Sequence, residues 1–340
     1  MSSPPTSASF ANAPLPALRV DQVRQIYNDG NHNAFTDLCR FRNRFYVTFR
    51  SCPDGHRLSV KSHIVILAST DGVGWTEVHR FGVPSRDVRD PHFLLFNDTL
   101  FVYAGTWLVP AGDQESDLND HLGYAAWTGD GTTWAGPRNL EGTYGHYIWQ
   151  AASHGGKAYL CGRRRDQFES IHKGEAHPEN IQSALLESQD GLIFRLAGLF
   201  TEDYGDETTF LFDSDGSIVA IARGAERRPA RICRARPPYR EWTRMELDRN
   251  VGGPLIARWG NRLLVAGRKM TRPNGPCTAL YFLVDDRLKE VAELPSGGDN
   301  SYPGFVALDE HRGILSYYSS HEGSGTSLAP SAIYLAELSV

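Results

Sequence analysis

The chain has 340 residues, of which 41% are hydrophobic and 22% charged, and its formal net charge is −5. A continuous apolar stretch of about 18 residues, which a membrane-spanning helix needs, does not occur. The negative net charge argues against a generally basic surface for nucleic acid, and the five scattered cysteines form no C-x-x-C pair that would indicate a zinc ribbon or a disulfide scaffold.

The first sixteen residues are rich in Ser, Pro and Ala and contain neither a basic nor an apolar segment. We therefore expect residues 1–16 to be a disordered lead rather than a secretory signal, and the protein to be cytoplasmic. Residues 17–340 are expected to form a single domain.

Short segments rich in β-branched and aromatic residues alternate with Gly, Pro, Asn and Asp, which predicts an all-β fold. The segments recur in sets. The innermost strand of each set is expected to begin near one of six residues: Asn33, Arg89, His146, Glu207, Gly253 and Ser301. This repeat predicts a six-bladed β-propeller of four-stranded blades. The last set has three strands, and the segment at residues 17–27 is expected to complete it, so that no sheet edge stays open.

One turn motif occurs three times, at residues 69–75, 128–134 and 188–194, with the pattern Ser/Thr-x-Asp-Gly-x-x-aromatic. In such a turn the Asp and the Ser or Thr bind backbone groups, and the Gly takes a positive φ. We therefore interpret Asp71, Asp130 and Asp190 as structural residues. The motif resembles the Asp-box of the sialidase and BNR-repeat superfamily, which implies a six-bladed propeller with the box between the third and fourth strands of a blade.

In a propeller the start of each first strand meets the end of each second strand at one mouth of the central channel. The resemblance implies that Glu207 there supports Tyr302 as a nucleophile, and that Arg223 and Arg268 clamp a substrate carboxylate. Two departures are visible. The first-blade Arg motif of sialidases is replaced by Asn33–Asp37, and the loop that carries their acid Asp offers Asp54 or His56 instead.

Further residues at this mouth complete the expected site. His32 and Asp37 are candidates for catalysis. The candidates for substrate binding are Arg50, Arg89, Asp90, His146, Arg164 and His321. The histidines show no ligand spacing along a single element, so no metal and no cofactor is expected.

Several arginines in one mouth of an acidic protein favour an anionic partner, because guanidinium pairs with carboxylate through two parallel hydrogen bonds. The expected partner is an acidic mono- or oligosaccharide; nucleic acid and membrane are not expected, and a homo-oligomer is left open. The first hypothesis is an exo-acting glycoside hydrolase that uses the Tyr/Glu pair and the Arg clamp. The alternatives are a uronic-acid lyase with His or Tyr as base, and a non-catalytic glycan-binding propeller with exposed Trp107, Trp149 and Tyr147 stacking on sugars.

Overall fold

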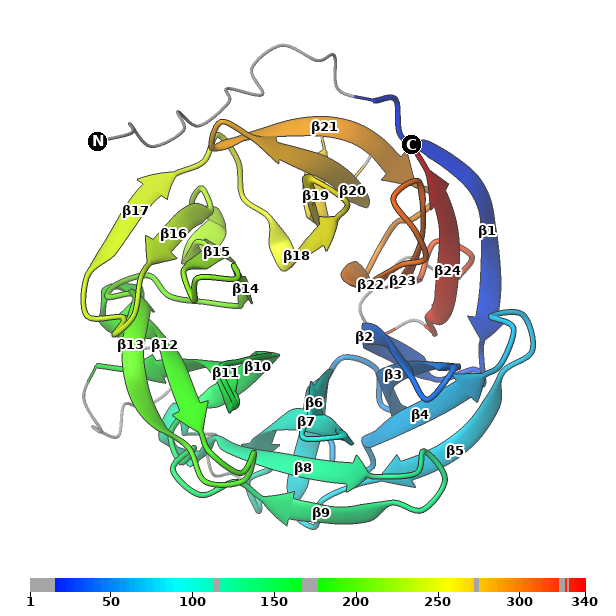
Figure 1. Ribbon diagram of the computed structural model, residues 1–340. Helices are drawn as coiled ribbons and strands as arrows, with labels where there is room; N and C mark the ends of the chain where they lie inside the picture. Colours follow the sequence, from blue (N-terminus) through cyan, green and yellow to red (C-terminus); the bar gives the residue numbers. More distant parts are fainter. Residues whose placement is uncertain (1–15, 113–116, 167–176, 272–274, 324–327, 329) are drawn as a thin grey trace.

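A computed structural model describes residues 16–112, 117–166, 177–271, 275–323, 328 and 330–340. Within these residues, six antiparallel sheets of four strands each stand in a ring around a central axis (Figure 1). The predicted six-bladed propeller is therefore confirmed. All of the predicted disordered lead except residue 16 lies outside the described residues. Where the structure is described, no helix has both the length and the apolar character needed to cross a membrane.

The first three blades follow the chain without interruption. Blade 1 contains β2 (His32–Phe41), β3 (Arg44–Cys52), β4 (His63–Ser69) and β5 (Thr76–Phe81). Blade 2 contains β6 (Arg86–Phe96), β7 (Thr99–Leu108), β8 (Leu122–Thr128) and β9 (Ala135–Asn139), with the 3₁₀ turn η1 (Leu118–Asp120) before β8. Blade 3 contains β10 (Tyr147–His154), β11 (Lys157–Arg165), β12 (Ile181–Ser188) and β13 (Arg195–Thr201), with η2 (Pro178–Asn180) before β12.

The other three blades repeat this order until the last strand. Blade 4 contains β14 (Thr208–Phe212), β15 (Ile218–Ala222), β16 (Arg231–Ala235) and β17 (Trp242–Glu246), with η3 (Ala225–Arg227) before β16. Blade 5 contains β18 (Gly252–Trp259), β19 (Arg262–Thr271), β20 (Gly275–Val284) and β21 (Arg287–Leu294). Blade 6 contains β22 (Asn300–Ala307), β23 (Arg312–Ser319), β24 (Ala332–Ser339) and, from the other end of the chain, β1 (Arg19–Tyr27).

The N-terminal strand closes the ring, as the sequence predicts. β1 pairs antiparallel with β24, from Arg19 opposite Ser339 to Tyr27 opposite Ile333, and Figure 1 shows these two strands side by side. Arg24 adds an ion pair to Glu337 at 2.5 Å. Through this pairing, the last blade has four strands like the others.

The apolar core lies between neighbouring blades. One cluster joins Tyr46 and Ile64 of blade 1 to Val88, Phe93 and Val102 of blade 2, all of them buried. Because each sheet is covered on both faces by its neighbours, the inner strands are apolar almost continuously instead of alternating. The packing of each sheet against both neighbouring sheets keeps the blades in place around the axis.

The three Asp turns lie between the third and fourth strands of blades 1 to 3, as expected. In the first of them, the Asp71 carboxylate accepts hydrogen bonds from the backbone N–H groups of Val73 at 2.8 Å and Gly74 at 3.0 Å. Asp130 and Asp190 make the same two bonds in their own turns. These carboxylates are occupied in holding turns, which agrees with the structural interpretation.

Removal of β1 tests how much the ring depends on its closure. A chain that begins at residue 28 should unfold at a lower temperature than one that begins at residue 16, and it should self-associate, because the edge of β24 is left unpaired. Differential scanning calorimetry and size-exclusion chromatography measure both effects. Equal unfolding temperatures and monomeric elution of both chains would contradict the importance of this pairing.

Candidate active site

The inner strands carry bulges near one end. The pairing of the first with the second strand shifts register in five blades, after Ala34, Arg89, Ile148, Gly252 and Ser301. The residues that follow these positions are Phe35, Asp90, Trp149, Gly253 and Tyr302. Phe35, Asp90 and Tyr302 have positive φ values of 62°, 46° and 52°. Such backbone costs roughly 1–3 kcal/mol per residue and gathers at functional sites.

Tyr302 and Glu207 form the centre of the site. The Tyr302 hydroxyl donates a hydrogen bond to one oxygen of the Glu207 carboxylate. The other oxygen accepts bonds from Arg223 Nη1 at 2.7 Å and from the backbone N–H of Gly253 at 2.8 Å. Only glycine fits at position 253, because its φ is +55° and a Cβ atom there would lie 2.6 Å from the Tyr302 ring. The fold therefore brings a phenol from blade 6 into direct contact with a carboxylate whose other oxygen binds a guanidinium of the same blade 4.

The pKa values in this group are set by burial and by charge. Burial alone would raise the pKa of Glu207, but the charge of Arg223 and the hydrogen bonds from Tyr302 and Arg223 hold it below its usual value. Burial and the negative charge of Glu207 raise the pKa of Tyr302 well above its usual value. At neutral pH the pair is therefore a charged carboxylate and a neutral phenol, which is the state in which the carboxylate can accept the phenolic proton.

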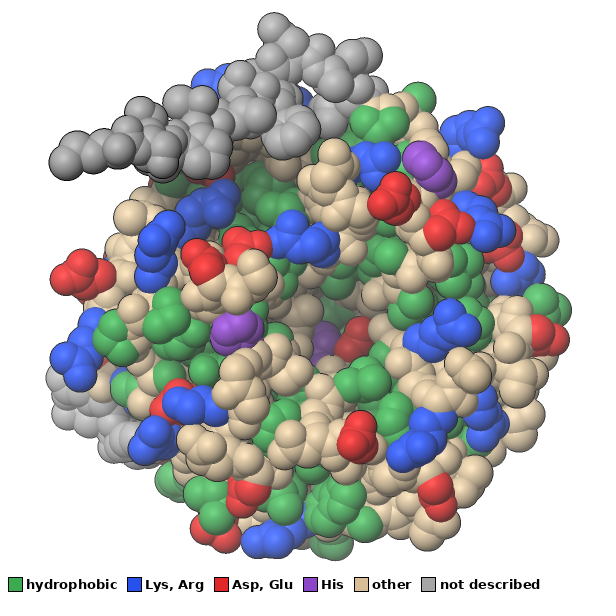
Figure 2. Space-filling model, viewed as in Figure 1, with side chains coloured by type: hydrophobic (Ala, Val, Ile, Leu, Met, Phe, Trp, Pro, Cys, Tyr) green, Lys and Arg blue, Asp and Glu red, His purple; other side chains and the backbone are tan. Residues whose placement is uncertain are grey.

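Three arginines surround this pair and are only partly buried. Arg268 stands over the Tyr302 ring, 5.4 Å from its centroid. Arg163 pairs with Asp206 at 3.0 Å, and Arg223 approaches the same carboxylate at 3.5 Å. The exposed fractions of the Arg163, Arg223 and Arg268 side chains are 28%, 26% and 20%. Figure 2 shows a hollow at the centre of the ring. Partly exposed guanidinium groups such as these three can bind an anionic group.

A second phenol–carboxylate pair lies beside the first. The Tyr147 hydroxyl donates to the Asp90 carboxylate, and both side chains are buried. Burial, followed by the negative charge of Glu207, raises the pKa of Asp90 to about 6. Arg163 lies 5.4 Å from the Tyr147 ring centroid and links the second pair to Asp206. Asp90 is thus the carboxyl group of this site that is poised to titrate near neutral pH.

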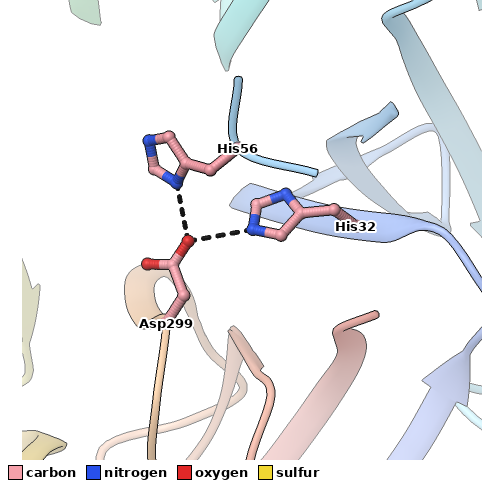
Figure 3. Close-up of side chains that lie close together, drawn as sticks. All are labelled: His32, His56 and Asp299. Atoms are coloured by element: carbon pink, nitrogen blue, oxygen red, sulfur yellow. Dashed lines mark hydrogen bonds and ion pairs between the residues drawn. The ribbon is translucent and has the colours of Figure 1, made fainter. Parts of the chain in front are cut away.

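His32, His56 and Asp299 form a cluster in which both histidines bond to the aspartate (Figure 3). One oxygen of Asp299 lies 2.9 Å from His32 Nε2 and 2.6 Å from His56 Nδ1. The other oxygen accepts bonds from Arg268 Nη2 and the Tyr318 hydroxyl, both at 2.9 Å. Burial would raise the pKa of Asp299, but the hydrogen bonds from both histidines and the charge of Arg268 hold it well below its usual value.

Asp299 is absent from the residues that the sequence predicts for the site. It occurs three positions before Tyr302 in Ser296-Gly-Gly-Asp-Asn-Ser-Tyr302, directly ahead of the sixth inner strand. An Asp at such a position is visible in the sequence, but its two histidine partners are more than 240 residues away. The pairing therefore could not be read from the spacing.

His32, His56 and Asp299 could also hold a metal ion, since one ligand atom of each lies within 4.8 Å of the others. Two observations disfavour it. A metal-bound histidine normally donates its other ring N–H to an acceptor, whereas the buried Nδ1 of His32 has no partner. The Arg268 guanidinium also bonds to the same carboxylate and repels a second cation.

Two predicted residues of blade 1 occupy other roles. Arg50 is expected to bind substrate, but its side chain is 0% exposed and its guanidinium bonds to Asp87 and to the carbonyl oxygens of Gly55 and Arg57. It cannot reach a ligand in this position and holds the loop that carries His56. Asp54 bonds to Ser59 and Lys61 and points to solvent.

The remaining predicted residues bond to groups other than Tyr302 and Glu207. Arg89 binds Asp87 at 2.6 Å and the carbonyl oxygen of His56 at 2.6 Å, so it also supports that loop. Asp37 accepts a hydrogen bond from the backbone N–H of Phe93 in blade 2. The other three bond to residues outside the Tyr302 group: His146 to the Tyr144 carbonyl oxygen, Arg164 to Gln182 and His321 to Ser319.

The expected sugar-stacking aromatics need a correction. Trp149 and Tyr147 are only 3% and 6% exposed, so neither offers an open ring face. Trp149 packs against His92 and Tyr302 instead. Trp107 is partly exposed, with its ring centroid 4.1 Å from that of His121.

Comparison with known proteins agrees with this architecture. A protein of unknown function from Dyadobacter fermentans is 20% identical, with a TM-score of 0.78, over 96% of this chain and 100% of its own. Trypanosoma rangeli sialidase is 11% identical, with a TM-score of 0.66, over 90% of this chain. Phage phi92 endosialidase is 11% identical, with a TM-score of 0.64, over 94% of this chain and 69% of its own. The fold is sialidase-like.

These likenesses concern the fold alone, because all the identities are low. The sialidase-like chain spans 55% of the length of the trypanosomal protein. No family model and no curated protein matches it. What the sialidase-like propeller does must therefore be argued from its own side chains.

The raised pKa of Asp90 predicts a specific pH dependence of stability. A carboxyl whose pKa is higher in the folded state stabilises the fold below its unfolded pKa, and this contribution is lost as the pH rises through about 6. Relative to Asp90→Asn, the wild type should lose on the order of 3 kcal/mol of unfolding free energy between about pH 4 and pH 7. Urea denaturation at several pH values measures the difference, and a constant difference would contradict the raised pKa.

Proposed function

We propose that this protein is an exo-acting glycoside hydrolase that cleaves an acidic sugar of the sialic or uronic acid type, with Tyr302 as nucleophile and Glu207 as its base. The hydrogen bond from the Tyr302 hydroxyl to the Glu207 carboxylate carries this proposal. A buried phenol is a weak nucleophile until a neighbouring carboxylate takes its proton. A neutral phenol also suits a negatively charged substrate, which would repel a carboxylate nucleophile.

The cations around the pair support an anionic substrate. Arg223 and Arg268 lie next to the Tyr302/Glu207 pair and Arg163 pairs with the adjacent Asp206, and all three are partly exposed, although the net charge of the chain is −5. Guanidinium groups are the side chains best suited to a carboxylate. Trypanosoma rangeli sialidase, which shares the fold, has been solved with sialic acid and as a covalent intermediate with 2,3-difluorosialic acid.

One observation favours a second candidate, a uronic-acid lyase. His56 and His32 lie beside Arg268 and could serve as bases near a carboxylate bound by that arginine. A lyase abstracts the proton next to the uronate carboxylate and leaves an unsaturated sugar that absorbs ultraviolet light, whereas a hydrolase adds water. Product analysis distinguishes the two.

The Tyr/Glu pair is tested by two conservative variants. Tyr302→Phe and Glu207→Gln should each lower turnover roughly 10²–10⁴-fold, because each removes a group needed to form or charge the nucleophile. The probes are the 4-methylumbelliferyl glycosides of N-acetylneuraminic, glucuronic and galacturonic acid, followed by fluorescence. Binding of the corresponding free sugars, measured by calorimetry, should persist in both variants.

A matched control is Tyr27→Phe, which alters a tyrosine on the outermost strand β1 and should keep full turnover. Unchanged turnover in both site variants would overturn the assignment of Tyr302 and Glu207. Binding of an acidic sugar with no turnover of any probe by the wild type would instead favour a glycan-binding propeller.

A further inference from the structure

We infer that His56 is the proton-transfer group of this site and that Asp299 is its positioning residue. The inference rests on the proposed glycoside hydrolysis and adds the acid that such a reaction requires. A Tyr nucleophile alone leaves the departing glycosidic oxygen without a proton, and a positioned acid typically contributes 10²–10⁴-fold to the rate.

The geometry of His56 is that of a histidine oriented by a carboxylate. Its Nδ1 lies 2.6 Å from Asp299 Oδ2, and Figure 3 shows the second ring nitrogen pointing away from Asp299. The side chain is 34% exposed, whereas that of Asp299 is only 7% exposed. Asp299 therefore binds the inner nitrogen and leaves the outer nitrogen, Nε2, open to a ligand.

One aromatic ring lies between His56 and the nucleophile. The Phe35 ring packs edge-on against both His56, at 5.3 Å between centroids, and Tyr302, at 4.9 Å. Phe35 occupies one of the bulges and has a positive φ of 62°. This strained residue contacts both groups, so a single ring links His56 to Tyr302.

The structure distinguishes the two acids that the loop offers. Asp54 is 39% exposed, and its oxygens are held by the Ser59 hydroxyl at 2.6 Å and Lys61 Nζ at 3.2 Å. His56 turns inward instead, and its backbone carbonyl is held by Arg89 Nη2 at 2.6 Å. Of the two, only His56 bonds to Asp299 among the contacts described.

Charged and titratable groups face the dyad from every neighbouring element. They are His32 on β2, Arg50 on β3, Arg89 on β6, Arg268 on β19 and Tyr318 on β23. Burial lowers the pKa of His32, so that His32 stays neutral and donates Nε2–H to Asp299. With His32 neutral and Asp299 charged, the carboxylate remains able to stabilise an imidazolium at His56.

The proposed reaction balances over two steps. In the first, the imidazolium form of His56 gives its Nε2 proton to the glycosidic oxygen while the bond from that oxygen to the anomeric carbon breaks, and its electron pair stays on the oxygen. The Tyr302 oxygen bonds to the anomeric carbon, and its proton passes to Glu207. In the second, water attacks that carbon and gives a proton to His56, while the Tyr302 oxygen leaves with its electron pair and recovers its proton from Glu207.

Leaving-group dependence tests the role of His56. The probes are aryl glycosides of whichever acidic sugar the wild type cleaves, made with phenols from the most acidic, 2,4-dinitrophenol, to unsubstituted phenol. His56→Asn should stay within about tenfold of the wild type on the dinitrophenyl probe, which needs no acid, and lose roughly 10²–10⁴-fold on the phenyl probe. The matched control is His63→Asn, at the first residue of β4 directly after this loop, whose ring bonds only to the Lys61 carbonyl oxygen among the contacts described. An equal loss on all probes would overturn the role of His56.

The role of Asp299 is tested by nitrogen-15 NMR of the histidine-labelled full chain. Neutral His56 should carry its proton on Nδ1 in the wild type and shift toward the Nε2–H tautomer in Asp299→Ala. Asp299→Ala should also reproduce the leaving-group pattern of His56→Asn. The wild-type spectrum decides the matter even where Asp299→Ala does not fold. A neutral His56 with its proton on Nε2 would overturn the proposed His56–Asp299 pair.

Two further outcomes are separable. Zinc that stays bound after desalting in the wild type, but not in His56→Asn, would show that the cluster is a metal site and overturn the inference. If the wild type cleaves no probe, the proposed function and the role of His56 in it both fail, and the spectrum still decides whether the His56–Asp299 pair exists. A failed leaving-group pattern in an active enzyme overturns the role of His56 alone.

Discussion

The pairing of β1 with β24 closes the ring, and the contacts at its centre depend on that closure. Tyr302 belongs to blade 6, and Glu207 stands directly before the inner strand of blade 4. His56 comes from a loop of blade 1 and reaches Asp299 beside blade 6. These blades meet only if the ring has a fixed circumference, since an open array could spread at its free edge.

Strain and buried charge are concentrated where the inner strands meet. The bulges place Phe35, Asp90 and Tyr302 in left-handed backbone conformations, and the tightly packed blades hold them there. The charged groups at the centre of the ring form ion pairs, such as Glu207 with Arg223 and Asp299 with Arg268. The pairing compensates for the burial of these charges and keeps their orientation defined. A substrate carboxylate would then enter a site whose cations are already oriented.

The two phenol–carboxylate pairs differ in their surroundings. Glu207 has a guanidinium and a backbone N–H as partners, and its pKa is held low. Asp90 is buried beside the charge of Glu207, and its pKa is raised to about 6. Neighbouring carboxyl groups whose pKa values are pushed apart are typical of sites that move protons. The two carboxyl groups therefore differ in pKa because their surroundings differ, and not because of their residue type.

The sequence by itself determined the six-bladed, all-β architecture and the closure by the N-terminal strand, because both depend on local turn chemistry and on a repeat of short segments. The meeting of Tyr302, Glu207 and Arg223 was expected only from the resemblance to sialidases. The tertiary structure alone decided that Arg50 supports a loop, that Trp149 is buried and that Asp299 joins His32 to His56. Each of these depends on burial or on contacts between distant segments, and the side-chain direction at a bulge cannot be read from spacing, since one extra residue reverses the face of a strand.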